Sequence, residues 1–255
     1  MSLFVSLIWG LIFWIYMFGI LPFWIPYFLL KGLGLTKLTD GYFIWIHHLQ
    51  CQLIVRSIGT TVVIHQLDKV PMDRPICYIG NHQGYADILV LLGWLPKIPG
   101  FIGKNSLLFV PVVNFWMLMN GSLFLDRKNL RKGMETIHRG AQRVKEGIPM
   151  VIFPEGGRNK GGPLRPFKRG AFKLAFLSEA TIVPFSIRGT EDMLERTGRV
   201  QLFQRIDLLF HDPIPTAGLG KAAQEQVVEQ VHGVILHGLE KIEDIRSTNN
   251  LTKIK

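Results

Sequence analysis

Residues 76–87, ICYIGNHQGYAD, place an apolar run directly before a polar loop and the start of a helix. The run ICYIG has the length and the β-branched and aromatic content of a buried strand. The residues after it include His82 and Asp87, at the kind of strand end where α/β folds usually position reactive side chains. This stretch therefore predicts a strand that brings functional residues to one edge of a sheet.

The alternation of short β-rich runs and helical stretches continues on both sides of this segment. Strands are predicted at 61–67, 75–81, 99–104, 122–126, 149–155, 181–187 and 201–210. Helices are predicted over 84–95, 128–146, 169–178 and 221–245. A chain of 255 residues is long enough for one catalytic domain with an appended segment. We expect a single α/β domain over residues 58–255, with a mixed central β-sheet flanked by helices.

Residues 1–30, MSLFVSLIWGLIFWIYMFGILPFWIPYFLL, contain no Asp, Glu, Lys, Arg or His, which is typical of a membrane segment. The run falls between the length of one span, about 20 residues, and that of two spans. Pro22 and Pro26 predict a first helix that ends near Ile20 and a broken second piece. Either one helix crosses the bilayer, or the whole segment enters one leaflet as a bent hairpin. We expect residues 1–57 to form membrane-anchoring helices.

The formal charge of +10 favours partners that present negative charge: anionic membrane lipids, a phosphate-bearing substrate, an acidic carrier protein or nucleic acid. Positive residues follow the apolar run at Lys31, Lys37 and Arg56, so we expect the domain on the cytoplasmic side of a bacterial inner membrane. Cys51 and Cys77 have no CxxC or metal-type spacing. We therefore expect no disulfide and no bound metal.

His82 and Asp87 have the side-chain chemistry of a base and its supporting carboxylate. A neutral imidazole can take the proton of a hydroxyl while that oxygen attacks a thioester carbonyl. A carboxylate on the other ring nitrogen fixes the tautomer and stabilises the imidazolium. On a regular helix two residues five positions apart would point about 140° apart, so His82 is expected in the loop and Asp87 in the first helical turn. Taken alone, the spacing fits a structural hydrogen bond better than a catalytic pair.

Further blocks follow NHQGYAD in a fixed order along the chain. They are GSLFLDR at 121–127, FPEGGR at 153–158, FKRGA at 167–171 and VPFSI at 183–187, with looser matches at Lys104 before Pro111 and at IPTAG, 214–218. In this order the blocks resemble those of the PlsC-type glycerophospholipid acyltransferases, also called 1-acyl-sn-glycerol-3-phosphate acyltransferases. Several ordered matches are far more specific than any one of them.

The resemblance implies an enzyme that moves a fatty acyl group from acyl-CoA or acyl-acyl carrier protein to the sn-2 hydroxyl of 1-acylglycerol-3-phosphate, making phosphatidic acid. His82 would act as general base and Asp87 would orient it, with no acyl-enzyme and no cofactor besides the donor substrate. The absence of a G-x-S-x-G elbow agrees with direct attack.

The same resemblance implies where the lysophospholipid acceptor binds. Its phosphate would meet Arg127 and Arg158, since guanidinium groups match phosphate oxygens two at a time. Lys104 would be a further phosphate contact, and Gly156 belongs to the same acceptor-binding block. Glu155 would meet the glycerol hydroxyl or a supporting arginine, although it could instead cap a turn or pair with Arg158.

Gly157 departs from the family pattern, which usually has Thr at this position, and the departure leaves the acceptor open. A different lysophospholipid or a lyso-aminolipid is therefore an alternative acceptor for the same blocks. A basic, membrane-tethered binding protein without activity would also fit the charge and the apolar segment. That hypothesis gives no reason for the ordered blocks, and the sequence has no zinc-finger or RNA-binding signature, so nucleic acid is not an expected partner.

Overall fold

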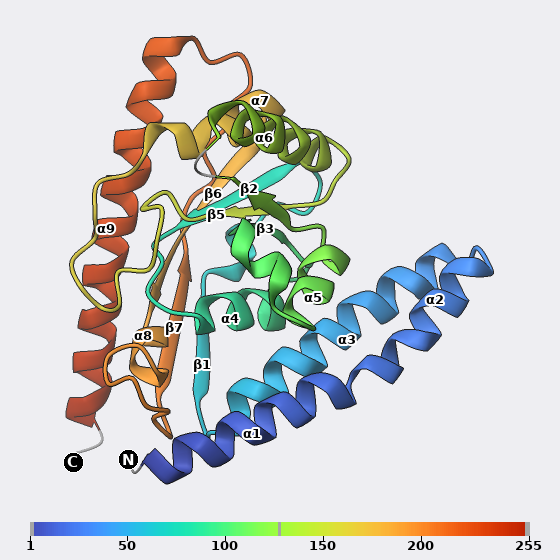
Figure 1. Ribbon diagram of the computed structural model, residues 1–255. Helices are drawn as coiled ribbons and strands as arrows, with labels where there is room; N and C mark the ends of the chain where they lie inside the picture. The colour runs from blue at the N-terminus through green and yellow to red at the C-terminus, as the bar shows by residue number, and fades with distance from the viewer. Residues whose placement is uncertain (1–2, 127–128, 253–255) are drawn as a thin grey trace.

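The computed structural model describes residues 3–126 and 129–252, and a seven-stranded β-sheet lies at its centre (Figure 1). The strand order across the sheet is β1-β7-β6-β2-β5-β3-β4. The strands are β1 (Thr61–His65), β2 (Ile76–Gly80), β3 (Gly100–Lys104), β4 (Leu123–Leu125), β5 (Met150–Ile152), β6 (Thr181–Arg188) and β7 (Arg205–Phe210). All of them fall where the sequence predicted a strand, and β6 extends one residue further.

The sheet is mixed, as predicted. The pairs β6–β2, β2–β5, β5–β3 and β3–β4 are parallel, whereas β7 is antiparallel to β6 and parallel to β1. Five strands therefore end at the same edge of the sheet, which we call the C-terminal edge. Parallel strands gather the loops that follow them on one side, and ligands of α/β folds bind on that side.

The helices are α1 (Leu3–Gly19), α2 (Ile25–Gly32), α3 (Thr36–Arg56), α4 (Ala86–Trp94), α5 (Val113–Met119), α6 (Leu130–Lys145), α7 (Lys173–Ser178), α8 (Thr190–Met193) and α9 (Lys221–Thr252). Short 3₁₀ turns cover Leu21–Trp24, Leu67–Lys69, Asn105–Phe109 and Arg169–Phe172. The sequence did not predict α5 or α8. The first lies in an almost uniformly apolar stretch that lacks the 3.6-residue period, and the second is a single turn.

Helices cover both faces of the sheet. Tyr78, Val183 and Phe185 point into the core beneath α4, to which α3 adds Cys51. Cys77, Ile79 and Ile182, their neighbours along the strands, point to the other face and pack against residues of α6, α7 and α9. The ribbon shows α9 as a long helix along the side of the sheet away from α3 and α4 (Figure 1). The α/β fold class expected from the sequence is confirmed.

The N-terminal helices form a hairpin that lies along the domain. The first helix ends at Gly19 and a 3₁₀ turn containing Pro22 follows before α2, as the two prolines predicted; α2 continues outward from α1, and α3 runs back along them (Figure 1). The turn between α2 and α3 projects beyond the domain (Figure 1). One helical stretch of the described residues, Ser6–Gly32, is long and apolar enough to cross a membrane. The helical hairpin ends at Arg56 and β1 begins at Thr61, on either side of the boundary predicted at 57/58.

Candidate active site

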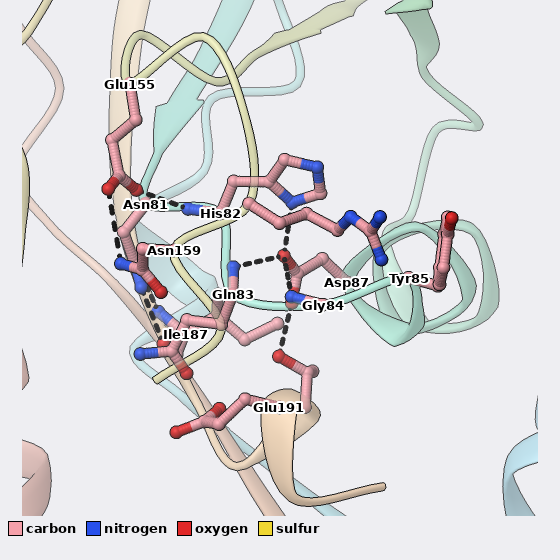
Figure 2. Close-up of polar contacts among 12 residues, drawn as sticks. Asn81, His82, Gln83, Gly84, Tyr85, Asp87, Glu155, Asn159, Ile187 and Glu191 are labelled. Atoms are coloured by element: carbon pink, nitrogen blue, oxygen red, sulfur yellow. Dashed lines mark hydrogen bonds and ion pairs between the residues drawn. The ribbon is translucent and has the colours of Figure 1, made fainter. Parts of the chain in front are cut away.

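His82 and Asp87 meet at the C-terminal end of β2, in the loop that leads into α4 (Figure 2). Nδ1 of His82 lies 2.6 Å from Oδ2 of Asp87. His82 is in the loop and Asp87 in the first turn of α4, as the spacing predicted. Buried Asn81 fixes the start of the loop, because its side-chain amide exchanges two hydrogen bonds of 2.8 Å with the backbone of Ile187 in β6.

The Asp87 carboxylate is fully buried and is surrounded by donors. Its Oδ2 also accepts hydrogen bonds from the backbone N–H groups of Gln83, at 2.8 Å, and Gly84, at 3.1 Å. Its Oδ1 accepts from the hydroxyl of Thr190, the first residue of α8. These bonds compensate the burial of a charged group. An acceptor-only carboxylate on Nδ1 places the ring proton there and leaves Nε2 as the unprotonated nitrogen.

The imidazole of His82 lies flat on the ring of Phe153, the residue after β5, with ring centroids 4.0 Å apart and 14° between the planes. Phe153 in turn meets Phe185 of β6 edge-on. The side chain of His82 is 16% exposed, and among the described residues none is hydrogen-bonded to Nε2. The ring is therefore held on one face and at one nitrogen, and the other nitrogen is free to act on a substrate.

Glu155 supports the same loop from the end of β5. Its side chain is buried, and Oε1 accepts a hydrogen bond of 2.8 Å from the backbone N–H of His82. Oε2 accepts from Asn159, at 3.2 Å, and from Arg165, at 3.3 Å. Two backbone bonds, from Asn159 N–H to His82 C=O and from Lys160 N–H to Gln83 C=O, join the loops further. The supporting arginine of Glu155 is thus Arg165, while Arg158 has another partner.

Arg158 is held beside the loop by Tyr85 and Glu195. Its guanidinium carbon lies 3.5 Å from the centre of the Tyr85 ring, and its Nη1 donates to Oε1 of Glu195 at 3.0 Å. The same oxygen accepts the backbone N–H of Tyr85 at 2.6 Å. Glu195 is nearly buried, and its Oε2 has no hydrogen-bond partner among the described groups. Part of the charge of Arg158 is therefore already compensated before any anion binds.

Two other predicted substrate residues, Lys104 and Gly156, lie in elements at this edge of the sheet. Lys104 is the last residue of β3, at the C-terminal edge, and is exposed. Gly156 has a positive φ of 75°, and a Cβ at this residue would lie 2.7 Å from Nζ of Lys168, so this lysine covers the glycine turn. Arg127 lies outside the described residues; β4 ends two positions before it. His82, Glu155 and Arg158 are brought together by direct contacts between the 81–85 and 155–160 loops.

Sequence analysis did not single out several residues that shape the site. Thr190 follows the VPFSI block by three positions, so proximity to a block was a usable signal. Arg165 lies two positions before the FKRGA block and has the same signal, whereas Glu195 follows no block closely, and an isolated acidic residue is usually a surface group. Glu191 is fully buried under the loop, and desolvation raises its pKa; an amide of Gln83 turned to donate would lie 3.0 Å from its Oε1 (Figure 2). No group of three His, Cys, Asp or Glu side chains within 3–126 and 129–252 could hold a metal ion.

An α/β fold with polar and ionisable side chains at the ends of parallel strands is shared by many classes of enzyme, and the sequence comparisons narrow the choice. The sequence model of a family described as acyltransferase matches residues 61–188, which span β1 to β6 and include His82, Asp87, Glu155 and Arg158. The chain therefore belongs to the acyltransferase family.

Individual relatives agree with this assignment. A chloroplast 1-acyl-sn-glycerol-3-phosphate acyltransferase of Brassica napus is 35% identical over 154 residues, which are 59% of this chain and 44% of that protein. A putative 1-acyl-sn-glycerol-3-phosphate acyltransferase of Caenorhabditis elegans is 26% identical over 226 residues, 88% of this chain and 77% of that one. The chain thus spans less than half the length of the plant relative.

The fold has a counterpart among solved structures. The crystal structure of the 1-acyl-sn-glycerophosphate acyltransferase PlsC from Thermotoga maritima superposes with a TM-score of 0.75 at 23% identity, covering 93% of this chain and 98% of that one. This likeness shows the fold. Together with the family model and the relatives, it confirms the predicted resemblance to the PlsC-type acyltransferases.

Proposed function

We propose that this enzyme transfers a fatty acyl group from acyl-CoA or acyl-acyl carrier protein to the sn-2 hydroxyl of 1-acylglycerol-3-phosphate. The names of the relatives support this acceptor. The observation that carries the chemistry is the 2.6 Å contact between Nδ1 of His82 and the buried carboxylate of Asp87, which leaves Nε2 as a base. The reaction needs no cofactor besides the donor thioester.

In the proposed mechanism the acceptor oxygen attacks the thioester carbonyl carbon while its proton passes to Nε2 of His82. The developing imidazolium is stabilised by Asp87, whose four hydrogen bonds keep it in place. Collapse of the tetrahedral intermediate breaks the C–S bond, and the thiolate leaves with the proton from the imidazolium. Phe153 stacks on one face of the imidazole, which holds the orientation of the ring and excludes water from that face.

We propose that Arg158, Arg127 and Lys104 bind the acceptor phosphate. A dianionic headgroup needs more than one cation, and Arg158 already shares its charge with Glu195. The guanidinium stacked on Tyr85 keeps further N–H donors for an anion, and this stacking supports Arg158 as the oriented member of the set. Gly156 would belong to the acceptor-binding turn, on which the side chain of Lys168 lies. Glu155 would act by holding the His82 backbone rather than by touching the acceptor.

The proposed location is the cytoplasmic face of a bacterial inner membrane, with anionic lipids as partners. The apolar stretch Ser6–Gly32 supports membrane attachment, and Lys31, Lys37 and Arg56 lie close to it in sequence. Exposed Lys168 and Arg169 are candidates for docking an acidic carrier protein. Reversal of both charges is expected to slow turnover with the carrier-bound donor more than with acyl-CoA.

The experiment is release of free thiol from each donor in the presence of lysophosphatidic acid, in detergent or liposomes. His82→Ala and Asp87→Asn are expected to lower kcat by about 10²- to 10⁴-fold, the usual contribution of general-base catalysis. Asn can keep its amide oxygen toward the backbone donors and its NH₂ toward Thr190, so Asp87→Asn should stay folded. His237→Ala, at an exposed position on α9, is the matched control. Full activity of His82→Ala would refute the mechanism.

The acceptor is tested with the same assay on a panel of lysophospholipids and lyso-aminolipids. A lysophosphatidic acid kcat/KM at least tenfold above the others is expected. If a lyso-aminolipid were the better acceptor and His82→Ala still abolished transfer to it, the acceptor assignment would fail while the catalytic assignment stood.

A further inference from the structure

The connection between β3 and β4 is an apolar segment that leaves the C-terminal edge and returns to the sheet. Residues 105–125 contain no Asp, Glu, Lys, Arg or His. The segment Asn105–Met119 forms the 3₁₀ turn Asn105–Phe109 and then α5. Leu108, Phe109 and Leu118 are exposed on it, and Phe109 is 85% exposed. On a water-exposed surface, charged side chains normally interrupt apolar patches of this kind, and this segment contains no charged residue.

This segment packs directly against the N-terminal hairpin. Trp116 of α5 meets Trp24 edge-on at 5.2 Å between ring centroids and contacts His47 of α3 at 5.3 Å. Val112 belongs to the same buried cluster as Met17, Ile20 and Trp24. The inner side of the segment therefore packs in the same core as the hairpin. Its exposed side chains lie next to the hairpin, whose outer surface is also apolar.

The outer face of α1 indicates what covers the exposed side chains of this segment. Leu7, Leu11 and Ile15 are all more than half exposed and repeat at the spacing of one helix face. The stretch Ser6–Gly32 is also apolar and long enough for a membrane. Because the β3–β4 segment is joined to this hairpin by a buried aromatic cluster, a bilayer that receives α1 lies next to the segment.

We propose that the segment Asn105–Met119 is a second membrane-inserting surface, which places Phe109 and Leu118 in the hydrocarbon of the same bilayer that holds the N-terminal hairpin. The segment begins directly after Lys104, and β3 ends at the same edge as β2, whose following loop carries His82. Its insertion holds the C-terminal edge of the sheet at the lipid surface, where a lipid substrate can reach the site without leaving the bilayer. This holds for any lipid acceptor and does not depend on the proposed one.

The test places a cysteine at Phe109 or Leu118 and labels it with a fluorophore. The native Cys51 and Cys77 are buried, and labelled wild-type protein measures their background. The full-length variants are mixed with vesicles of phosphatidylethanolamine and phosphatidylglycerol that carry a nitroxide quencher on the acyl chain. Leu177→Cys in α7 and Leu236→Cys in α9 provide controls at exposed leucines on the helices of the other face of the sheet.

Nitroxide lipids are expected to quench the probes at positions 109 and 118 at least threefold more than those at 177 and 236. Iodide in the water should show the reverse order. Both positions 109 and 118 are exposed, so the substitutions leave the core intact, and two separate sites guard against a local artefact. Quenching at 109 and 118 no greater than at the control positions, on vesicles that do bind the protein, would overturn the proposal. Protection of these probes by an acyl carrier protein, without lipid quenching, would assign the surface to a protein instead.

Discussion

The hydroxyl of Thr190 donates a hydrogen bond to Oδ1 of Asp87, while the three other donors to this carboxylate, from His82, Gln83 and Gly84, all meet Oδ2. Both side chains are fully buried. Thr190 begins α8, directly after β6, and Asp87 lies in the helix after β2, so the bond joins segments that follow neighbouring strands. Without it, one oxygen of the proposed catalytic carboxylate would be buried and unpaired.

Thr190→Val keeps the shape of the side chain and removes the donor. A hydrogen bond to a charged group contributes about 1.5–3 kcal/mol, so kcat is expected to fall by about 10- to 100-fold if the carboxylate turns away from His82. The acceptor KM should stay within a factor of two, because Thr190 lies behind the pair. Steady-state thiol release over a range of acceptor concentrations gives both values.

Thr190→Ser retains the hydroxyl and is the matched control, with an expected kcat within about threefold of the wild type. An equal loss in the serine variant would mean that the threonine methyl group, rather than its hydrogen bond, is what matters. Unchanged activity in the valine variant would show that Asp87 is positioned well enough by the loop amides alone.

Glu155→Gln replaces one carboxylate oxygen with an NH₂ group that must face donors, since Oε1 accepts from His82 N–H and Oε2 from Asn159 and Arg165. The side chain is buried, so the mismatch costs about 1–3 kcal/mol and loosens the loop that carries the base. Both Tm and kcat are expected to fall, by thermal unfolding and thiol release respectively. Glu225→Gln is the control: it loses only the exposed ion pair with Arg169 and should change neither Tm nor kcat. A Glu155→Gln variant as stable and active as this control would contradict the role of Glu155 in holding the His82 loop.

Gly80→Ala adds a methyl group at the end of β2, where a Cβ would overlap the ring of Phe185. Phe185 meets Phe153, and Phe153 carries the imidazole of His82, so displacement of one ring passes to the next. We expect about 1–3 kcal/mol of destabilisation together with reduced kcat. Gly233→Ala on α9, where nothing lies within 4 Å, should be neutral or stabilising by up to about 1 kcal/mol. Recovery of stability by adding Phe185→Leu would identify the overlap as the cause.

His211 makes stability depend on pH. Burial, aided by Lys69 and Lys241, lowers the pKa of His211 from 6.5 to about 4. Between these two pH values the unfolded chain binds more protons at His211 than the folded chain does. The contribution of His211 to the free energy of unfolding is therefore fully present above pH 6.5 and is lost as the pH falls toward 4. Denaturant unfolding in detergent at several pH values should show this loss. His211→Gln is expected to flatten this pH dependence, and an unchanged slope would exclude His211 as a source.

The local sequence pattern was sufficient to predict the strands and the pairing of His82 with Asp87. Strands such as ICYIG and TIVPFSI are continuous apolar runs of strand length, and a strand needs little beyond its own residues to be recognised. The loop after β2 binds Asp87 through neighbouring amides, so five positions of sequence already contain most of the His82–Asp87 geometry. The break between α1 and α2 near Ile20 followed from two prolines.

The sequence by itself determined the seven strands, the apolar N-terminal helices and the pairing of His82 with Asp87, because each depends on residues close together in the chain. Only the tertiary structure decided the strand order and the partners that hold the pair. Thr190 lies 103 positions from Asp87, and Glu195 lies 37 positions from Arg158. Such contacts depend on which strands become neighbours, and that is set by how the whole sheet buries its two faces, a property no short segment contains.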